Sequence, residues 1–308
     1  MATEVPNYKK NKWWPKFING LWTVLSTISP TFATKLVHKR YLNYPLNLDN
    51  PKTLNEKLQW LKLNTYYKND TVRQCADKVA VRSYIKSKGL EEILINSYGS
   101  WDKAKDIPWD NLPQSFVLKS NTGSQRNLLV TDKRQLNIEE TETMVNDWLS
   151  DKNYGPRNVE FSYNGIKNRV LAESFIDSED GDLIDYKFFC NYGEVRFLYV
   201  VSNRLGDEFY LNYYDEDGQP IQLHDSIFKS SDKIMKMPDN FEIMKKYASI
   251  LSKDFPIVRV DLYSEFGKIY FGELTFLPTG GRNNFGGYEQ DLAFGQMFDI
   301  SDAMSKER

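Results

Sequence analysis

Residues 258–263 read VRVDLY and residues 269–278 read IYFGELTFLP, and this pair of segments decides the fold. Both alternate with a period of two and are rich in β-branched and aromatic residues, which predicts a β-hairpin. On the second strand Glu273 and Thr275 lie two residues apart and share a face. Asp261 interrupts the apolar pattern of the first strand. A carboxylate inside a sheet needs a positive partner, and a hard cation such as Mg²⁺, shared with substrate phosphates, would be one.

The turn between the two strands determines whether the carboxylates meet. Cross-strand partners share a face, so Asp261 and Glu273 meet only if the loop has an odd number of residues. We therefore expect a three-residue loop at 264–266 with a bulge at Gly267. A four-residue loop would place the carboxylates on opposite faces. The alternative is that both simply face solvent on a half-exposed sheet.

Composition sets limits on the class of protein. The chain has 308 residues, of which 41% are hydrophobic and 14% aromatic, as is typical of a globular protein with one large domain or two to three subdomains. A net charge of −2 argues against a nucleic-acid binder. Two distant cysteines, Cys75 and Cys190, suit a reducing cytosol. With only His38 and His224, a histidine triad or a zinc-hydrolase site is not expected.

The N-terminal region is basic and aromatic. Residues 1–62 carry a charge of +7, which leaves −9 for the remainder and suggests attraction to an anionic surface. Residues 17–34 lack charge, but Gly20 and Pro30 make them a poor membrane-spanning helix. Lysines beside Trp13 and Trp14 suit a membrane headgroup region. We find no export signal and expect a cytoplasmic protein, whose N-terminal helix either contacts the inner face of the membrane or packs on the protein body.

The rest of the chain mixes helices with antiparallel hairpins, which indicates an α+β class. Thr53 is the expected N-cap of a helix, with Glu56 at the capping-box position. Further helices are expected at 71–88, 138–150 and about 239–253. Strands are expected at 94–95, 115–119, 127–130, 169–176, 185–190, 194–202 and 207–214.

One loop has features of a phosphate site. Lys119 ends a strand and opens the polar turn 120–126, which contains Gly123 and Ser124. A lysine beside small residues with free backbone N–H groups can cradle phosphate. An ordinary hairpin loop with a solvated lysine would have the same pattern.

Two further charged residues lie within apolar strands. Glu173 could accept a hydrogen bond from an exocyclic amine or a ribose hydroxyl. Lys187 shares a face with Asp185 and would need an anion, either a ligand or a structural salt bridge. The acidic run 215–218 has the spacing of an Asp-x-Asp metal motif of glycosyltransferases, but Gly218 favours a hairpin turn.

Taken in order, these segments resemble the ATP-grasp superfamily and, within it, the TupA-like family of teichuronopeptide biosynthesis. The resemblance covers roughly residues 45–300. The motifs that carry it are LNEKLQWL at 54–61, FVLKSN at 116–121, DYKFFC at 185–190, DFPIVRVDLY at 254–263 and GELTF at 272–276.

The resemblance implies a fold in which two α+β subdomains with antiparallel sheets clasp ATP. The implied regions are a helical extension at 1–50, an N-terminal region at 51–114, a small subdomain at 115–176 and a large subdomain with the metal site at 177–308. The residues implied to contact ATP are Lys78, Lys119, Ser124, Glu173 and Lys187. The residues implied to hold Mg²⁺ are Asp261, Glu273 and Thr275. Lys187, Arg259 and Arg282 are the implied catalytic residues, the two arginines as candidates for gripping the acceptor carboxylate.

Two positions depart from the family pattern. Thr275 stands where the wider superfamily has Asn, and a hydroxyl is a weaker metal ligand. The loop reads TGSQRN at 122–127 and lacks two glycines that are usual there, which stiffens it. Arg126 in this loop could bind phosphate or substrate.

The activity implied by the resemblance is ATP-dependent ligation of a carboxylate to an amine through an acyl phosphate. An amino acid and a uronic acid of a cell-surface polysaccharide are the implied substrates. A glycosyltransferase or a sugar kinase of polysaccharide synthesis is the alternative, and a non-catalytic nucleotide-binding module is a third reading.

Overall fold

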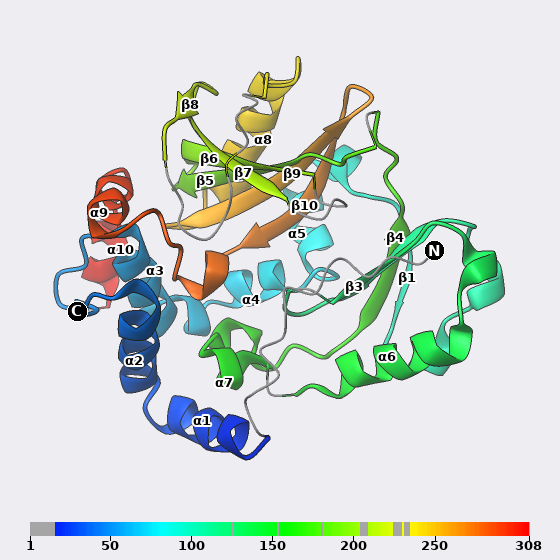
Figure 1. Cartoon of the computed structure of the whole chain (residues 1–308), viewed down its shortest axis with the longest axis horizontal. Coiled ribbons are helices and arrows are strands. Elements are labelled where there is room, and N and C mark those ends of the chain that lie inside the picture. The colour runs from blue at the N-terminus through cyan, green and yellow to red at the C-terminus, as the bar shows by residue number, and fades with distance from the viewer. Residues whose placement is uncertain are drawn as a thin grey trace.

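The computed structural model describes residues 16–124, 126–152, 154–179, 181–203, 209–223, 230 and 235–307. Within them lie two antiparallel sheets surrounded by helices, so the expected α+β class is confirmed (Figure 1). The lysines and tryptophans at 9–14 lie outside the described residues.

The smaller sheet has the strand order β1-β4-β2-β3. Its strands are β1 (Ser97–Trp101), β2 (Phe116–Ser120), β3 (Asn127–Val130) and β4 (Val170–Ser174). Helix α6 (Ile138–Ser150) packs on it through Val145, in a core that also contains Leu118 and Val130. Strand β1 comes from the expected N-terminal region 51–114, so that region supplies an edge strand of this sheet; the division into four regions stays a proposal.

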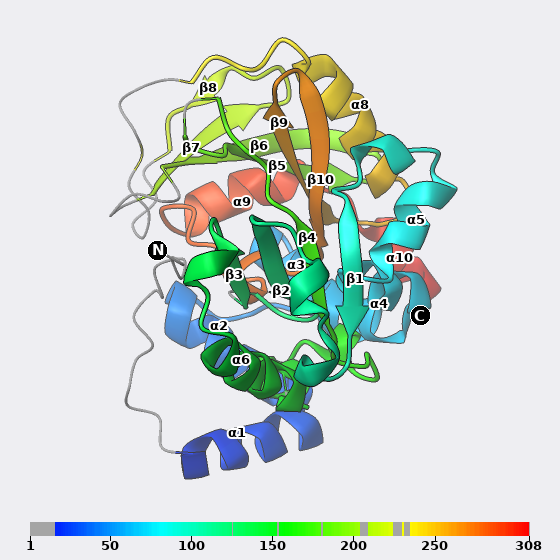
Figure 2. The same cartoon turned by 90° about the vertical axis from the view of Figure 1, so that its right-hand side faces the viewer.

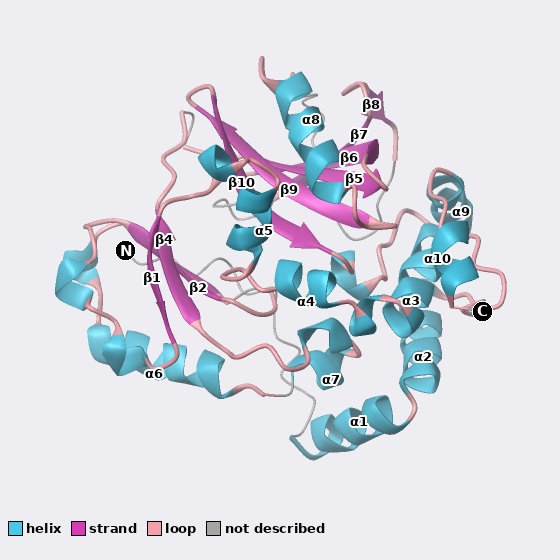
Figure 3. Cartoon of the chain, turned by 180° about the vertical axis from the view of Figure 1, so that it is seen from behind, coloured by secondary structure: helices cyan, strands magenta, loops and turns pink. Residues whose placement is uncertain are grey.

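The larger sheet has the strand order β10-β9-β5-β6-β7-β8. Its strands are β5 (Asp185–Asn191), β6 (Glu194–Ser202), β7 (Tyr210–Asp215), β8 (Pro220–Ile221), β9 (Val258–Glu265) and β10 (Lys268–Thr275). Helix α8 (Phe241–Ser252) covers one face, as Figure 3 shows from behind. Phe188, Met244 and Val260 are buried in this core. Asp215 accepts a hydrogen bond from Gly218 N, as expected of a turn between β7 and β8.

The N-terminal helices lie along the outside of the molecule (Figure 2). They are α1 (Lys16–Ile28) and α2 (Pro30–Leu42). Trp22 Nε1 donates to the carbonyl of Arg157, at 3.0 Å, in α7 (Tyr154–Asn158), so α1 packs on the protein body. None of the helices in the described ranges combines the length and the apolar character that crossing a bilayer requires.

Helix α3 (Leu54–Asn64) has the expected capping box. Thr53 Oγ1 accepts from Glu56 N at 3.1 Å, and a Glu56 carboxylate oxygen accepts from Thr53 N at 3.1 Å. Asp291 of α9 (Tyr288–Gln296) accepts from Asn55 N at 3.0 Å, which ties α3 to α9. The last helix, α10 (Ser301–Lys306), follows α9.

The structure corrects two expected elements. The helix expected at 71–88 is two helices, α4 (Asp70–Ala76) and α5 (Val81–Ser87), because Asp77 is extended and its Oδ1 accepts from Val79 N at 2.8 Å. The strand expected at 94–95 is wrong. Residues 94–95 follow a short 3₁₀ helix at 91–93 and belong to no strand, and the nearest strand is β1, which begins at Ser97.

The β9–β10 hairpin is confirmed, but its expected loop is wrong. Glu265 pairs with Lys268, so the loop is the two residues Phe266 and Gly267, with φ of 50° and 71°. Positive φ at both positions matches the right-handed twist of the strands. An even loop would place the carboxylates on opposite faces. Instead the register shifts between Phe271 and Glu273, so the bulge lies inside β10 rather than at Gly267, where it was expected.

Candidate functional site

A row of polar side chains crosses four neighbouring strands of the larger sheet. Glu273 on β10 lies opposite Asp261 on β9, Asp261 opposite Lys187 on β5, and Lys187 opposite Tyr199 on β6. Directly opposed residues share a face, so these side chains gather on one side of the sheet. Asp261 is only 1% exposed, so a solvent-facing carboxylate is ruled out at this position.

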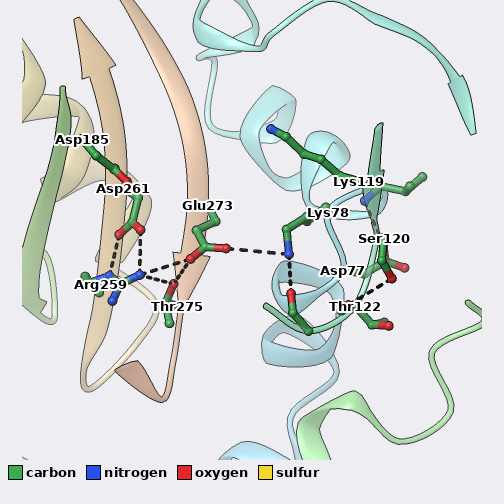
Figure 4. Close-up of polar contacts among 12 residues, drawn as sticks. Asp77, Lys78, Lys119, Ser120, Thr122, Asp185, Arg259, Asp261, Glu273 and Thr275 are labelled. Carbon is green, nitrogen blue, oxygen red and sulfur yellow. Dashed lines mark hydrogen bonds and ion pairs between the residues drawn. The ribbon is translucent and has the colours of Figure 1, made fainter. Parts of the chain in front are cut away.

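Arg259 joins the two carboxylates (Figure 4). Its Nε and Nη2 donate to the two oxygens of Asp261 at 2.6 and 2.7 Å. Nη2 also donates to Glu273 Oε1 and to Thr275 Oγ1, each at 3.1 Å, and Nη1 donates to the Tyr199 hydroxyl at 2.7 Å. The guanidinium is therefore the positive partner that the buried carboxylate needs.

Lys187 adds a second positive charge. Its Nζ lies 2.7 Å from Asp185 Oδ2 and also donates to Asp261. Burial favours the neutral lysine, but the charges of Asp185 and Asp261 outweigh it and raise the pKa of Lys187. For Asp261 burial is the larger effect: it raises the pKa of the carboxyl group, although the positive charges of Arg259 and Lys187 act to lower it.

Lys78 approaches the same cluster from the break between α4 and α5. Its backbone N–H donates to the Asn121 carbonyl at 3.0 Å, and its Nζ donates to the Gly123 carbonyl at 2.9 Å. The same Nζ lies 3.8 Å from Glu273 Oε2. Burial would raise the pKa of Glu273, but Lys78 and Arg259 hold it well below its ordinary value. Lys78 thus connects the loop of the smaller sheet with the hairpin of the larger one.

Lys119 and Glu173 form a separate pair on the smaller sheet. Lys119 Nζ donates to Glu173 Oε2 at 2.9 Å, and Arg82 of α5 donates to Glu173 Oε1 at 3.2 Å. With Phe271 and Gly272 of β10 they line a cavity of about 10 Å³, which has room for a water molecule. A nucleotide base can enter only if Arg82 or the sheets move. Arg82 belongs to no sequence motif, and nothing in the sequence singled it out.

A larger cavity of about 400 Å³ lies beside the carboxylate cluster. The candidate residues that line it are Lys78, Ser124, Arg259, Glu273, Thr275 and Arg282. Lys119 and Glu173 line the small cavity instead. Asp261 and Lys187 line neither of these two cavities. Arg259, which lines the large cavity, donates to Asp261 and so lies between this carboxylate and the cavity.

The oxygen atoms of this cluster are of the type that Mg²⁺ prefers. Asp261, Glu273 and Thr275 contribute two carboxylates and a hydroxyl of this type, and a hard cation bound there would take its remaining ligands from phosphate and water. In the described part of the chain, no group of three or more Asp, Glu, His or Cys side chains is close enough to form a fuller metal site. Arg259 and Lys187 already bind both Asp261 oxygens, which leaves Glu273 as the more available carboxylate.

Arg126 has a structural partner. It pairs with Asp151, which also accepts from Arg157 at 2.7 Å. This ion pair ties the loop after β2 to the chain between α6 and α7.

The family model of TupA-like ATP-grasp proteins matches residues 56–299. The chain belongs to this family. The resemblance read from the five motifs is thereby confirmed, and the TupA-like protein has the expected ATP-grasp fold, with helices preceding it.

Solved structures similar to this TupA-like protein include three ligases. D-alanine–D-alanine ligase from Helicobacter pylori has a TM-score of 0.43 and 16% identity, over 81% of this chain and 70% of that one. The corresponding Bacillus anthracis ligase has a TM-score of 0.45 and 17% identity, over 77% and 68%. An L-amino acid ligase from Bacillus licheniformis has a TM-score of 0.42 and 17% identity, over 77% and 52%. The search of curated protein sequences found no match.

Proposed function

We propose that this TupA-like protein is an ATP-dependent carboxylate–amine ligase. The observation that supports this most directly is the Lys78–Glu273–Arg259 cluster, where lysine, carboxylate and arginine from different parts of the chain border one cavity of about 400 Å³. A phosphoryl-transfer site needs such an arrangement, since it works by positioning and charge neutralisation.

In the proposed reaction the γ-phosphoryl group passes from ATP to a carboxylate oxygen and gives an acyl phosphate and ADP. An amine nitrogen then attacks the acyl carbon, the C–O bond to phosphate breaks, the nitrogen loses a proton, and an amide and phosphate remain. Lys78, Lys119 and Lys187 would bind phosphates, with Ser124 beside them. Glu173 would contact the adenine or ribose after leaving Arg82.

Asp261, Glu273 and Thr275 would hold Mg²⁺, which supplies positive charge to the phosphate oxygens when bound. Arg259 and Arg282 both border the cavity and would grip the acceptor carboxylate. Since Arg259 binds Asp261 and Glu273 in this structure, it would exchange part of these contacts for substrate.

We further propose that the acid is a uronic acid and the amine an amino acid, in the synthesis of a cell-surface polysaccharide such as a capsule, O-antigen or teichuronic-type polymer. The family name supports this assignment. The test is an assay with purified protein, ATP and Mg²⁺. ADP and phosphate should form only when acid and amine are both present.

Other outcomes of this assay would identify other activities. ATP use with a sugar alone, and phosphate retained on the product, would identify a sugar kinase. Transfer from a nucleotide sugar without ATP would identify a glycosyltransferase. Unchanged function after Glu273→Ala would indicate a non-catalytic nucleotide-binding module.

We also propose peripheral contact of α1 and α2 with the inner face of an anionic membrane. Each of these helices carries two exposed apolar residues four apart, Val24 and Ile28 on α1 and Phe32 and Leu36 on α2, which are between 45% and 78% exposed. Exposed cations lie among them at Lys35, Lys39 and Arg40. Such a basic, apolar surface suits an anionic lipid interface.

Sedimentation with lipid vesicles tests this contact. The protein should bind phosphatidylcholine vesicles that contain phosphatidylglycerol, and Ile28→Asp with Phe32→Asp should abolish binding because it places charge among the exposed apolar side chains of both helices. Ile138→Asp, at an exposed isoleucine of α6, is the matched control. Equal binding by the double variant would contradict the proposal.

A further inference from the structure

The large cavity extends to a carboxylate that the proposed roles leave unused. Glu160 follows α7 and lines the cavity together with Tyr154, Tyr163 and Arg282. Its side chain makes no hydrogen bond or ion pair with any residue that the structure describes. A partly buried carboxylate that no hydrogen-bond donor contacts can accept a hydrogen bond from a charged ligand.

The backbone before Glu160 is held in an unfavourable conformation. Val159 is buried and has a φ of 57°, a left-handed conformation that is rare for a β-branched residue. Glu160 N donates to the Gly155 carbonyl at 2.8 Å, and a side chain at Gly155 would lie 2.6 Å from Asn164 Oδ1. Strained residues of this kind persist where the surroundings enforce them, and they gather at ligand sites.

Two cationic side chains act on Glu160. Burial raises the pKa of Glu160 to about 7, against the charges of Lys62 and Arg282. Lys62 of α3 is 5% exposed, and burial lowers its pKa to about 7. Within the described residues the only hydrogen bond of the Arg282 side chain runs from Nε to the Thr279 carbonyl, at 3.3 Å. At this end of the cavity the wall therefore presents the carboxylate of Glu160 and the guanidinium of Arg282, apart from Lys78, Arg259 and Glu273 elsewhere in the lining.

We propose that this end of the cavity binds the amine substrate, an α-amino acid whose ammonium group pairs with Glu160 and whose carboxylate pairs with Arg282, which leaves Arg259 alone to grip the acceptor carboxylate. The inference rests on the proposed ligase function, which requires an amine beside the acyl phosphate. An α-amino acid carries both charges on one carbon, and the aromatic rings of Tyr154 and Tyr163 form the wall beside them. Glu160 is then the residue that distinguishes amino acids from other anions.

The test is binding of single amino acids to the full chain in the presence of ADP and MgCl₂. Each L-amino acid, with D-alanine and D-glutamate, is screened by thermal shift, and any that stabilises the protein is titrated by calorimetry. At least one should bind. Its N-acetyl derivative, which lacks the ammonium group, and Glu160→Gln should each weaken binding about tenfold or more.

Matched variants separate this role from folding and from nucleotide binding. Glu139→Gln, at an exposed carboxylate of α6, should change nothing. Arg282→Lys keeps the charge but loses the planar fork, and should weaken amino-acid binding while the affinity for ADP stays the same. Glu160→Gln should likewise leave the affinity for ADP unchanged.

Three results would overturn the inference. No amino acid binds, or the N-acetyl derivative binds as tightly as the amino acid, or Glu160→Gln lowers the affinity for ADP as much as the affinity for the amino acid. If no amino acid binds but the ligase assay succeeds with another amine, the proposed function stands and this subsite fails. If ADP itself does not bind, the proposed function fails first.

Discussion

Gly272 determines which side chains share the cavity face of the β9–β10 hairpin. The two-residue loop alone would separate Asp261 from Glu273, and the bulge at Gly272 restores their alignment. The alternating pattern of the two segments allowed us to predict that Asp261 and Glu273 lie on paired strands. It did not allow us to predict where the bulge lies, because Gly267 and Gly272 are both plausible positions and only strand pairing distinguishes them.

We predict that Gly272→Val destabilises the protein by about 1–3 kcal/mol and weakens nucleotide binding. A Cβ at Gly272 would lie 3.0 Å from the Asp261 carbonyl and 3.1 Å from the Tyr263 ring, so the bulge must shift. Urea unfolding and calorimetry measure the two effects. The control is Gly267→Asn, where a Cβ meets no atom within 4 Å and Asn tolerates positive φ. Equal stability of both variants would contradict this account of the bulge.

Arg259 was expected to bind substrate, but in the structure it also neutralises a buried carboxylate. We predict that Arg259→Met costs about 3–5 kcal/mol of unfolding free energy, because Asp261 then keeps only Lys187 as its cationic partner. Adding Asp261→Asn should recover part of the loss, since it removes the unpaired charge. Urea unfolding of the single and double variants measures this. Additive losses would show that the two side chains act independently.

At the scale of elements, the break between α4 and α5 was not predictable. Residues 71–88 contain no Gly or Pro, so the sequence favours one helix. Contacts outside the helices decide otherwise. Lys78 N donates to the Asn121 carbonyl, and Asp77, which ends α4, accepts from Val79 N through its side chain. The capping box at Thr53, in contrast, involves neighbouring residues alone, which is why the sequence predicted it correctly.

The ion pairs that tie the β2–β3 loop to α7 give a pH-dependent stability. Burial would raise the pKa of Asp151, but Arg157 and Arg126 lower it from 3.8 to about 2. A lowered pKa in the folded state means that the stabilisation is complete above about pH 4 and is lost as pH falls toward about 2. We predict that the melting temperature of Asp151→Asn falls less steeply over this range than that of the wild type. Parallel curves would show that these pairs contribute nothing.

At the scale of the whole molecule, strand order along the chain and family membership could be predicted from five motifs. The pairing of β1 with β4 could not, because it joins residues far apart in sequence. The contact of Arg82 with Glu173, which closes the small cavity, was equally unpredictable. A single arginine in a helix belongs to no sequence motif that would indicate its partner. Charged residues that belong to motifs were thus predictable from the sequence, whereas partners that only packing brings near them were not.

Lys78, Glu273 and their neighbours are proposed to form one site for ATP with Mg²⁺. Calorimetric titration of ATP into the full chain, with and without MgCl₂, tests it most directly when wild type and Glu273→Gln are compared. We predict that Mg²⁺ strengthens binding to the wild type and that the variant, still folded, loses at least about tenfold in affinity with Mg²⁺ present. Binding that is independent of Mg²⁺ and equal in both proteins, or no binding at all to the wild type, would contradict the account.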